Sequence, residues 1–129
     1  MTLVKIHLEL GRTADYPQGN PSLGYEFILP LAEDGHIDMA AWARCKDLCT
    51  VRRFNHGFTD RRGMVRHTGQ GWQFDYDKNS DSDNETFVRL ESHILAQGHY
   101  VSLRSGNRPV RPFKIVSVAP VAATQGASK

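Results

Sequence analysis

The feature of this chain that most constrains its fold is a series of short segments in which apolar and polar residues alternate. In the first segment, LVKIHLEL (3–10), every second residue from Val4 to Leu10 is apolar. Successive side chains of a strand point to opposite faces, so this period of two indicates a strand with one buried face. Further strand-like segments follow at residues 25–31, 49–54, 63–67, 72–76, 86–90, 99–104 and 112–118.

Many short strands separated by turn signals such as DRRG, TGQG and SGNR are typical of all-β folds. We therefore expect a mainly β protein, either a small antiparallel barrel or a strongly bent sheet of about seven to eight short strands. One short helix is predicted over residues 38–48, because Asp38 is a good N-cap residue. Trp42, Cys45 and Cys49 share one face of that helix, and we expect this face to cover the sheet or a barrel mouth.

The length of 129 residues predicts one domain, which we place at residues 1–118. Residues 119–129 are mostly small and polar, and they predict a disordered C-terminal tail. The first ten residues lack the continuous apolar stretch of a signal peptide, and no segment approaches the length of a membrane span. With only two cysteines, the chain also lacks a disulfide framework. We expect a cytoplasmic protein with no membrane partner.

Several segments of the chain are similar to those of known bacterial proteins. HILAQGHYVSLRS followed by FKIVSV resembles the last hairpin of many small β-barrels. Together with GYEFILPL, GHIDMAAW and GWQFDYD, these segments resemble a family of short bacterial proteins described as hypothetical. The resemblance covers roughly residues 3–118. It implies a barrel fold and a bacterial cytoplasmic protein, and it brings no assigned activity, cofactor or partner.

The charged residues are unevenly distributed, although the net charge is only +2. Residues 44–67 and the segment from His99 to the end are basic, whereas residues 1–43 and 75–91 are acidic. Both basic blocks are rich in arginine, which suits planar recognition of carboxylate or phosphate groups. The candidate ligand-binding surface is formed by five arginines: Arg52, Arg53, Arg66, Arg104 and Arg111.

This pattern leads us to expect a non-enzymatic binding or accessory module with an acidic protein partner, or one that self-associates. One alternative is single-stranded nucleic-acid binding, since such barrels combine basic grooves with stacking aromatic residues. Another alternative is that the arginines pair with acidic residues of the same chain. No nucleophile elbow, phosphate loop or flavin signature is present, so we expect no catalytic residue and no cofactor.

A metal-binding protein or enzyme that uses histidines together with Cys45 and Cys49 is a further alternative. The C-x3-C spacing differs from the C-x2-C of zinc sites, and His56 and His67 are the nearest additional candidates. The simpler interpretation, which we adopt, is that both cysteines pack as small apolar residues. We predict no metal site from this spacing.

The segment FDYDKNSDSDNE (74–85) resembles a calcium loop in its alternating oxygen ligands. Two requirements of such a loop fail. Ser80 occupies the position that needs glycine, and Glu85 comes one residue before the position of the closing glutamate. We therefore expect a polar loop joining two strands, with an adventitious cation site as the alternative.

Overall fold

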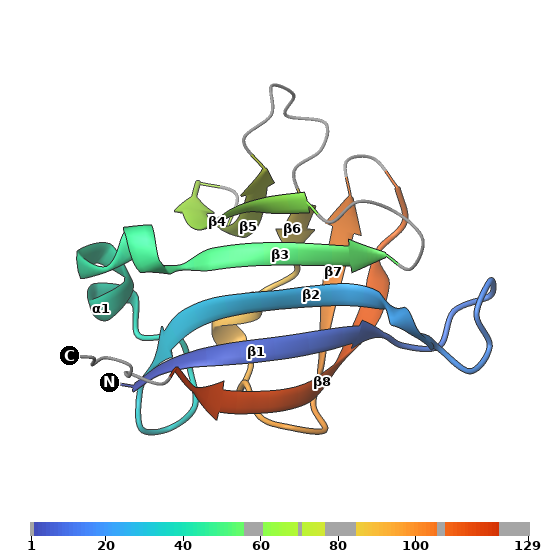
Figure 1. Cartoon of the computed structure of the whole chain (residues 1–129), viewed down its shortest axis with the longest axis horizontal. Helices are drawn as coiled ribbons and strands as arrows, with labels where there is room; N and C mark the ends of the chain where they lie inside the picture. Colours follow the sequence, from blue (N-terminus) through green and yellow to red (C-terminus); the bar gives the residue numbers. More distant parts are fainter. Residues whose placement is uncertain (1, 56–60, 70, 77–84, 106–107, 122–129) are drawn as a thin grey trace.

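In the computed structural model of this chain, the described residues (2–55, 61–69, 71–76, 85–105 and 108–121) form eight antiparallel strands that close into a barrel (Figure 1). The strands are β1 (Thr2–Leu10), β2 (Asn20–Leu31), β3 (Thr50–Asn55), β4 (Arg61–Thr68), β5 (Gly71–Tyr76), β6 (Glu85–Phe87), β7 (Tyr100–Ser105) and β8 (Arg111–Pro120). Each strand pairs with the next along the chain, and β8 pairs with β1. The predicted small antiparallel barrel is confirmed, and each predicted strand segment overlaps one of these strands.

Alternate residues of each strand fill the interior of the barrel. The four apolar residues that define the period of β1, from Val4 to Leu10, are all buried. Aromatic rings from three other strands pack at the centre, where the Phe74 ring centroid lies 5.1 Å from that of Phe27 and 4.9 Å from that of Phe87. The interior of a barrel of eight strands is just wide enough to be filled by side chains.

Two glycines allow strands to approach one another closely. Gly24 lies opposite Glu9, next to the position where the register between β1 and β2 shifts. A side chain at Gly24 would collide with the carbonyl oxygen of Leu8 and with the Phe54 ring. Gly63 on β4 is packed in the same way against the backbone of Asp75. The absence of a Cβ at these positions lets the sheet bend and close.

The helical segment is shorter than predicted. Asp38 is the N-cap of α1 (Met39–Arg44), and its carboxylate accepts a hydrogen bond from the Ala41 amide at 3.0 Å, as expected. The predicted single short helix is confirmed, but it ends before residue 48, because Cys45 leaves helical geometry at φ −135° and a 3₁₀-helix, η1 (Lys46–Leu48), follows. This break turns the chain so that Cys49 is buried immediately before β3 begins.

Helix α1 lies beside the end of the barrel at which β1 begins and β8 ends (Figure 1). The Trp42 ring packs edge-on against Trp72 of β5 at 5.1 Å between centroids, so the predicted covering role of this helix face is confirmed for Trp42. Among the described residues, neither α1 nor the short 3₁₀ segments have the length and apolar character that a bilayer-spanning helix requires.

The last strand extends two residues beyond the predicted domain end. Ala119 and Pro120 belong to β8 and lie opposite Lys5 and Val4, and the Val121 amide donates to the Leu3 carbonyl at 2.8 Å. The prediction that the tail begins at residue 119 is therefore wrong for these residues, because the long β1 supplies backbone partners that local composition does not reveal. The remainder of the predicted tail, 122–129, lies outside the described residues.

We expect Gly24→Ala to lower the free energy of unfolding by about 2–4 kcal/mol, since an added methyl group must displace backbone atoms of β1. Urea unfolding followed by tryptophan fluorescence measures the change. Gly69→Ala is the matched control, because nothing lies within 4 Å of a Cβ at Gly69. Equal effects of the two substitutions would contradict the proposed role of Gly24.

Candidate functional site

The five candidate arginines do not lie on one surface. Arg52 and Arg53 are adjacent in β3 and therefore point to opposite faces of the sheet. On the outside, Arg52 Nη2 donates to Glu26 Oε1 at 2.8 Å. On the inside, Arg53 Nη1 donates to Glu85 Oε2 at 3.2 Å. Each of these two arginines is thus compensated by a carboxylate of the same chain.

Arg66 on β4 is also paired within the chain, since its Nε atom lies 2.8 Å from Asp75 Oδ2. Self-pairing with acidic residues, one of the alternatives from the sequence, therefore describes three of the five arginines. Arg104 and Arg111 differ from them. Within the part of the chain that the structure describes, neither has an ion pair with a carboxylate, and both belong to the hairpin formed by β7 and β8.

The outer side of this hairpin combines basic and apolar side chains. Strand register places Tyr100 opposite Lys114, Ser102 opposite Pro112, and Arg104 opposite Thr86 of β6. Three large apolar side chains are exposed here or beside it: Val88 at 42%, Tyr100 at 52% and Val110 at 47%. We define the hairpin face by five residues: Val88, Tyr100, Arg104, Val110 and Lys114.

The electrostatics of the hairpin face follow from its sequence. No aspartate or glutamate occurs between His99 and Val121, so neither strand of the hairpin carries a carboxylate. Across the sheet, Glu9 of β1 lies opposite Lys114 and marks the border of the face. Arg108 is exposed in the segment between the two strands and adds to the positive charge.

Arg111 is placed differently from Arg104. Register pairs Arg111 with Leu103, so its side chain starts on the inward-facing side of β8. The guanidinium lies 5.7 Å above the Phe113 ring, at the rim of the barrel. Arg111 is therefore a neighbour of the hairpin face and not a member of it.

A buried polar cluster lies inside the barrel, near the end opposite α1. The Glu85 side chain is 1% exposed and accepts hydrogen bonds from Tyr25 Oη at 2.7 Å, Tyr76 Oη at 2.8 Å and Ser105 Oγ at 2.7 Å. Arg53 is the fourth donor to this carboxylate. We call these five residues the Glu85 cluster. Every partner donates to Glu85, which is the arrangement that satisfies an ionised carboxylate.

The Glu85 cluster holds both tyrosines in their neutral form. Burial raises the pKa of Tyr25 well above its ordinary value, and the charge and hydrogen bond of Glu85 raise it further. Burial likewise raises the pKa of Tyr76, with the charge of Glu85 as the next cause. Both hydroxyl groups are buried and act as hydrogen-bond donors, so the cluster holds strands together and has no exposed nucleophile.

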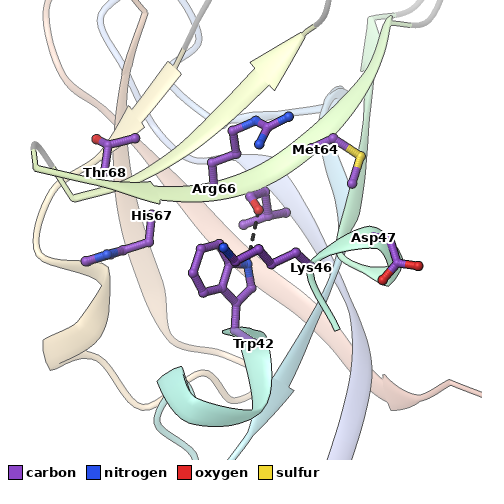
Figure 2. Close-up of a pocket in the computed structure, with 8 residues that line it drawn as sticks. Trp42, Lys46, Asp47, Met64, Arg66, His67 and Thr68 are labelled. Carbon is purple, nitrogen blue, oxygen red and sulfur yellow. Dashed lines mark hydrogen bonds between the residues drawn. The ribbon is translucent and has the colours of Figure 1, made fainter. Parts of the chain in front are cut away.

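A shallow groove of about 440 Å³ lies between the α1–η1 segment and β4 (Figure 2). Trp42 forms its floor, and the indole N–H donates to the Val65 carbonyl at 3.2 Å. Lys46 Nζ lies 5.0 Å above the Trp42 ring. Arg66, on the opposite wall, is paired with Asp75. Because its two permanent cations already have partners, the groove presents less available charge than the hairpin face.

The two cysteines lie at the ends of η1, next to this groove. The Cys45 and Cys49 sulfur atoms are 4.0 Å apart, and Cys49 is completely buried. Burial raises the pKa of the Cys49 thiol to about 12, with the charge of Cys45 as the next cause. Among the described residues, no group of three or more histidine, cysteine or acidic side chains is arranged to hold a metal ion. His56, one of the histidines considered as a ligand, lies outside the described residues.

The calcium-loop interpretation can be followed only at its two ends. Asp75 is engaged by Arg66, and Glu85 is buried in the barrel. Neither carboxylate is therefore available as an exposed ligand. Residues 77–84, which contain the other proposed ligands, lie outside the described residues.

No protein-family model, curated protein or solved structure matches this chain in the three comparisons made. The candidate sites are therefore assigned on geometry and charge alone.

Sequence reasoning missed Glu85 as a buried residue and considered it only as a displaced calcium ligand. One signal was present in the segment ETF. Glu85 and Phe87 are two residues apart in a strand, so they must share a face, and Phe87 is an obvious core residue.

We expect the free energy of unfolding to fall at alkaline pH because of Tyr25 and Tyr76. Their folded-state pKa values are raised, so their stabilising contribution is fully present below the unfolded pKa of about 10 and is lost as the pH rises above it. Each tyrosine contributes a slope of about 1.4 kcal/mol per pH unit above that point. Urea unfolding of the wild type and of Tyr76→Phe, between about pH 8 and pH 11, measures the slope.

Tyr76→Phe should remove one tyrosine's share of the slope and lower stability at neutral pH by about 1–2 kcal/mol, because Glu85 loses a donor. Tyr100→Phe is the control, since Tyr100 is exposed. Folding also raises the pKa of the Cys49 thiol, which adds the same slope to all three proteins. An unchanged slope in Tyr76→Phe would contradict the assignment.

Proposed function

We propose that this protein is a non-enzymatic binding module whose hairpin face binds an acidic segment of a partner protein. The observation that carries the proposal is the contrast among the five candidate arginines. Arg52, Arg53 and Arg66 are neutralised within the chain, whereas Arg104 lies on a face whose own strands carry no carboxylate. We therefore place the binding site on the face whose positive charge is not balanced by carboxylates of its own strands.

The apolar residues of the hairpin face favour a protein partner over a nucleic acid. Val88, Tyr100 and Val110 are exposed beside Arg104 and Lys114, and interface centres are enriched in tyrosine and arginine with a polar rim. Single-strand binders instead align several aromatic rings along a basic groove. On the hairpin face Tyr100 is the one aromatic residue, and it lies on the outside of a closed barrel.

Tyr100 is held in position although half of it is exposed. A Cβ placed at Gly11 would lie 3.3 Å from Tyr100 Cε2, so the ring rests against the chain just after β1. A side chain that is ordered before binding loses less conformational entropy on association. Tyr100 is therefore suited to be the apolar anchor of the interface.

The charges of this face are exposed, and exposed ion pairs each contribute about 0–1 kcal/mol. The expected complex is consequently weak and sensitive to salt, with the apolar residues supplying much of the affinity. A direct titration detects a complex of this strength.

The test is a ¹H–¹⁵N correlation spectrum of the full chain, titrated at low salt with a short synthetic peptide containing glutamate and leucine. We expect shifts at Tyr100, Arg104 and Lys114 that reverse as salt is added. Arg104→Gln should weaken binding roughly two- to fivefold, because one exposed charge contact is lost. Arg44→Gln at the end of α1 is the matched control, and we expect it to leave the affinity unchanged.

Three outcomes would overturn the proposal. A spectrum that responds to a short single-stranded RNA and not to the peptide would assign the face to nucleic acid. A molecular mass in sedimentation that rises with concentration, together with the hairpin shifts, would assign the face to self-association. A spectrum unaffected by the peptide, RNA or concentration would remove the hairpin face as a binding site.

A further inference from the structure

Cys45 and Cys49 form a thiol pair whose geometry is independent of the hairpin face. The cysteines are the residues that flank η1, and their sulfur atoms are 4.0 Å apart. A disulfide bond is about 2.05 Å long, so the sulfurs need to approach by about 2 Å. Cys45 is only partly buried, and rotation of its side chain can supply this movement.

The two thiols are unequal in accessibility. Cys45 is partly exposed, whereas Cys49 is completely buried and donates its S–H to the Cys45 carbonyl at 3.4 Å. A soluble oxidant therefore meets Cys45 first. Such a pair, with an accessible thiol beside a buried one, has the arrangement of an attacking and a resolving cysteine.

We propose that Cys45 and Cys49 are a reversible oxidation site at which a peroxide converts the two thiols into one intramolecular disulfide. In the first step the Cys45 thiolate attacks one oxygen of hydrogen peroxide. A sulfur–oxygen bond forms, the oxygen–oxygen bond breaks, and the departing hydroxide is protonated to water. The product is a sulfenic acid on Cys45.

In the second step the Cys49 sulfur attacks the Cys45 sulfur. The sulfur–oxygen bond breaks, and the hydroxide leaves as water with the proton of Cys49. Two thiols and one peroxide thus give one disulfide and two waters. The first step also favours the second, because a neutral sulfenic acid replaces the Cys45 thiolate whose charge raises the pKa of Cys49.

The consequence of oxidation lies in the neighbouring groove. Lys46 and Asp47, the residues next to Cys45 inside the prospective disulfide loop, line this groove (Figure 2). Lys46 lies over the Trp42 ring, so a change in η1 is transmitted to the aromatic floor. Oxidation therefore changes the wall of the groove without altering the barrel strands that carry the hairpin face.

The test uses the reduced full chain treated with equimolar hydrogen peroxide and then measured by intact mass under non-reducing conditions. We expect a monomer that has lost two hydrogen atoms, has no titratable thiol, and returns to the starting mass with dithiothreitol. The Trp42 indole N–H signal should shift on oxidation, while the Tyr100 amide signal should not.

Two substitutions test the two steps of the mechanism separately. Cys49→Ala should stop at the sulfenic acid, which dimedone traps as a stable adduct on Cys45. Cys45→Ser should leave the buried Cys49 roughly tenfold or more slower to alkylate than Cys45 in the wild type. The wild-type mass measurement decides the proposal even if neither variant folds.

The proposal is overturned by any of three results. In the first, the chain keeps both thiols while free glutathione in the same tube is consumed. In the second, the chain gains oxygen atoms without losing two hydrogens. In the third, disulfides form only between chains. Each of these results would show that the pair does not close into an intramolecular disulfide.

Discussion

The buried carboxylate of Glu85 is the interaction on which the polar end of the barrel depends. An unpaired charge in an apolar interior would cost several kcal/mol, and the cost is offset only if donors surround the carboxylate. The four donors come from β2, β3, β5 and β7, while Glu85 itself belongs to β6. One side chain therefore fixes the relative positions of five strands, including pairs that are not neighbours in the sheet.

This interior cluster also determines which charges remain on the outside. Arg53 must point inward to compensate Glu85, so the alternation of β3 places Arg52 outward, opposite Glu26 of β2. Glu26 of the acidic block 1–43, and Asp75 and Glu85 of the acidic block 75–91, are paired with arginines of the same chain. The last hairpin has no acidic residue of its own, and its exterior retains the positive charge. The proposed binding face thus carries the positive charge that is left after the other arginines have paired with carboxylates of the chain.

Much of the fold follows from local sequence, because the period of two and the turn residues are local signals. The same holds for Asp38, whose capping role depends on the three residues that follow it. The closure of β8 onto β1 does not follow from local signals, since their paired residues are more than a hundred positions apart. The end of the helix at Cys45 also does not follow from local signals, because it depends on the burial of Cys49 in the core immediately before β3.

The pairing of the arginines was predictable only where the partner is close in sequence. Arg66 and Asp75 lie on β4 and β5, which follow one another along the chain. Counting the register outward from Thr68 and Gly71 brings the two residues to diagonal positions. Glu26 and Glu85 are 26 and 32 residues from their arginine partners, and no local pattern links them. Long-range pairing therefore decided which candidate arginines were available for a partner.

The thiol pair and the hairpin face lie in different parts of a closed barrel. The pair flanks η1, between β2 and β3, whereas β7 ends and β8 begins at the opposite end of the barrel by strand order. Sites that share no contacts contribute additively to free energy. Oxidation at the thiols and binding at the hairpin face should therefore act as separate properties of one rigid scaffold.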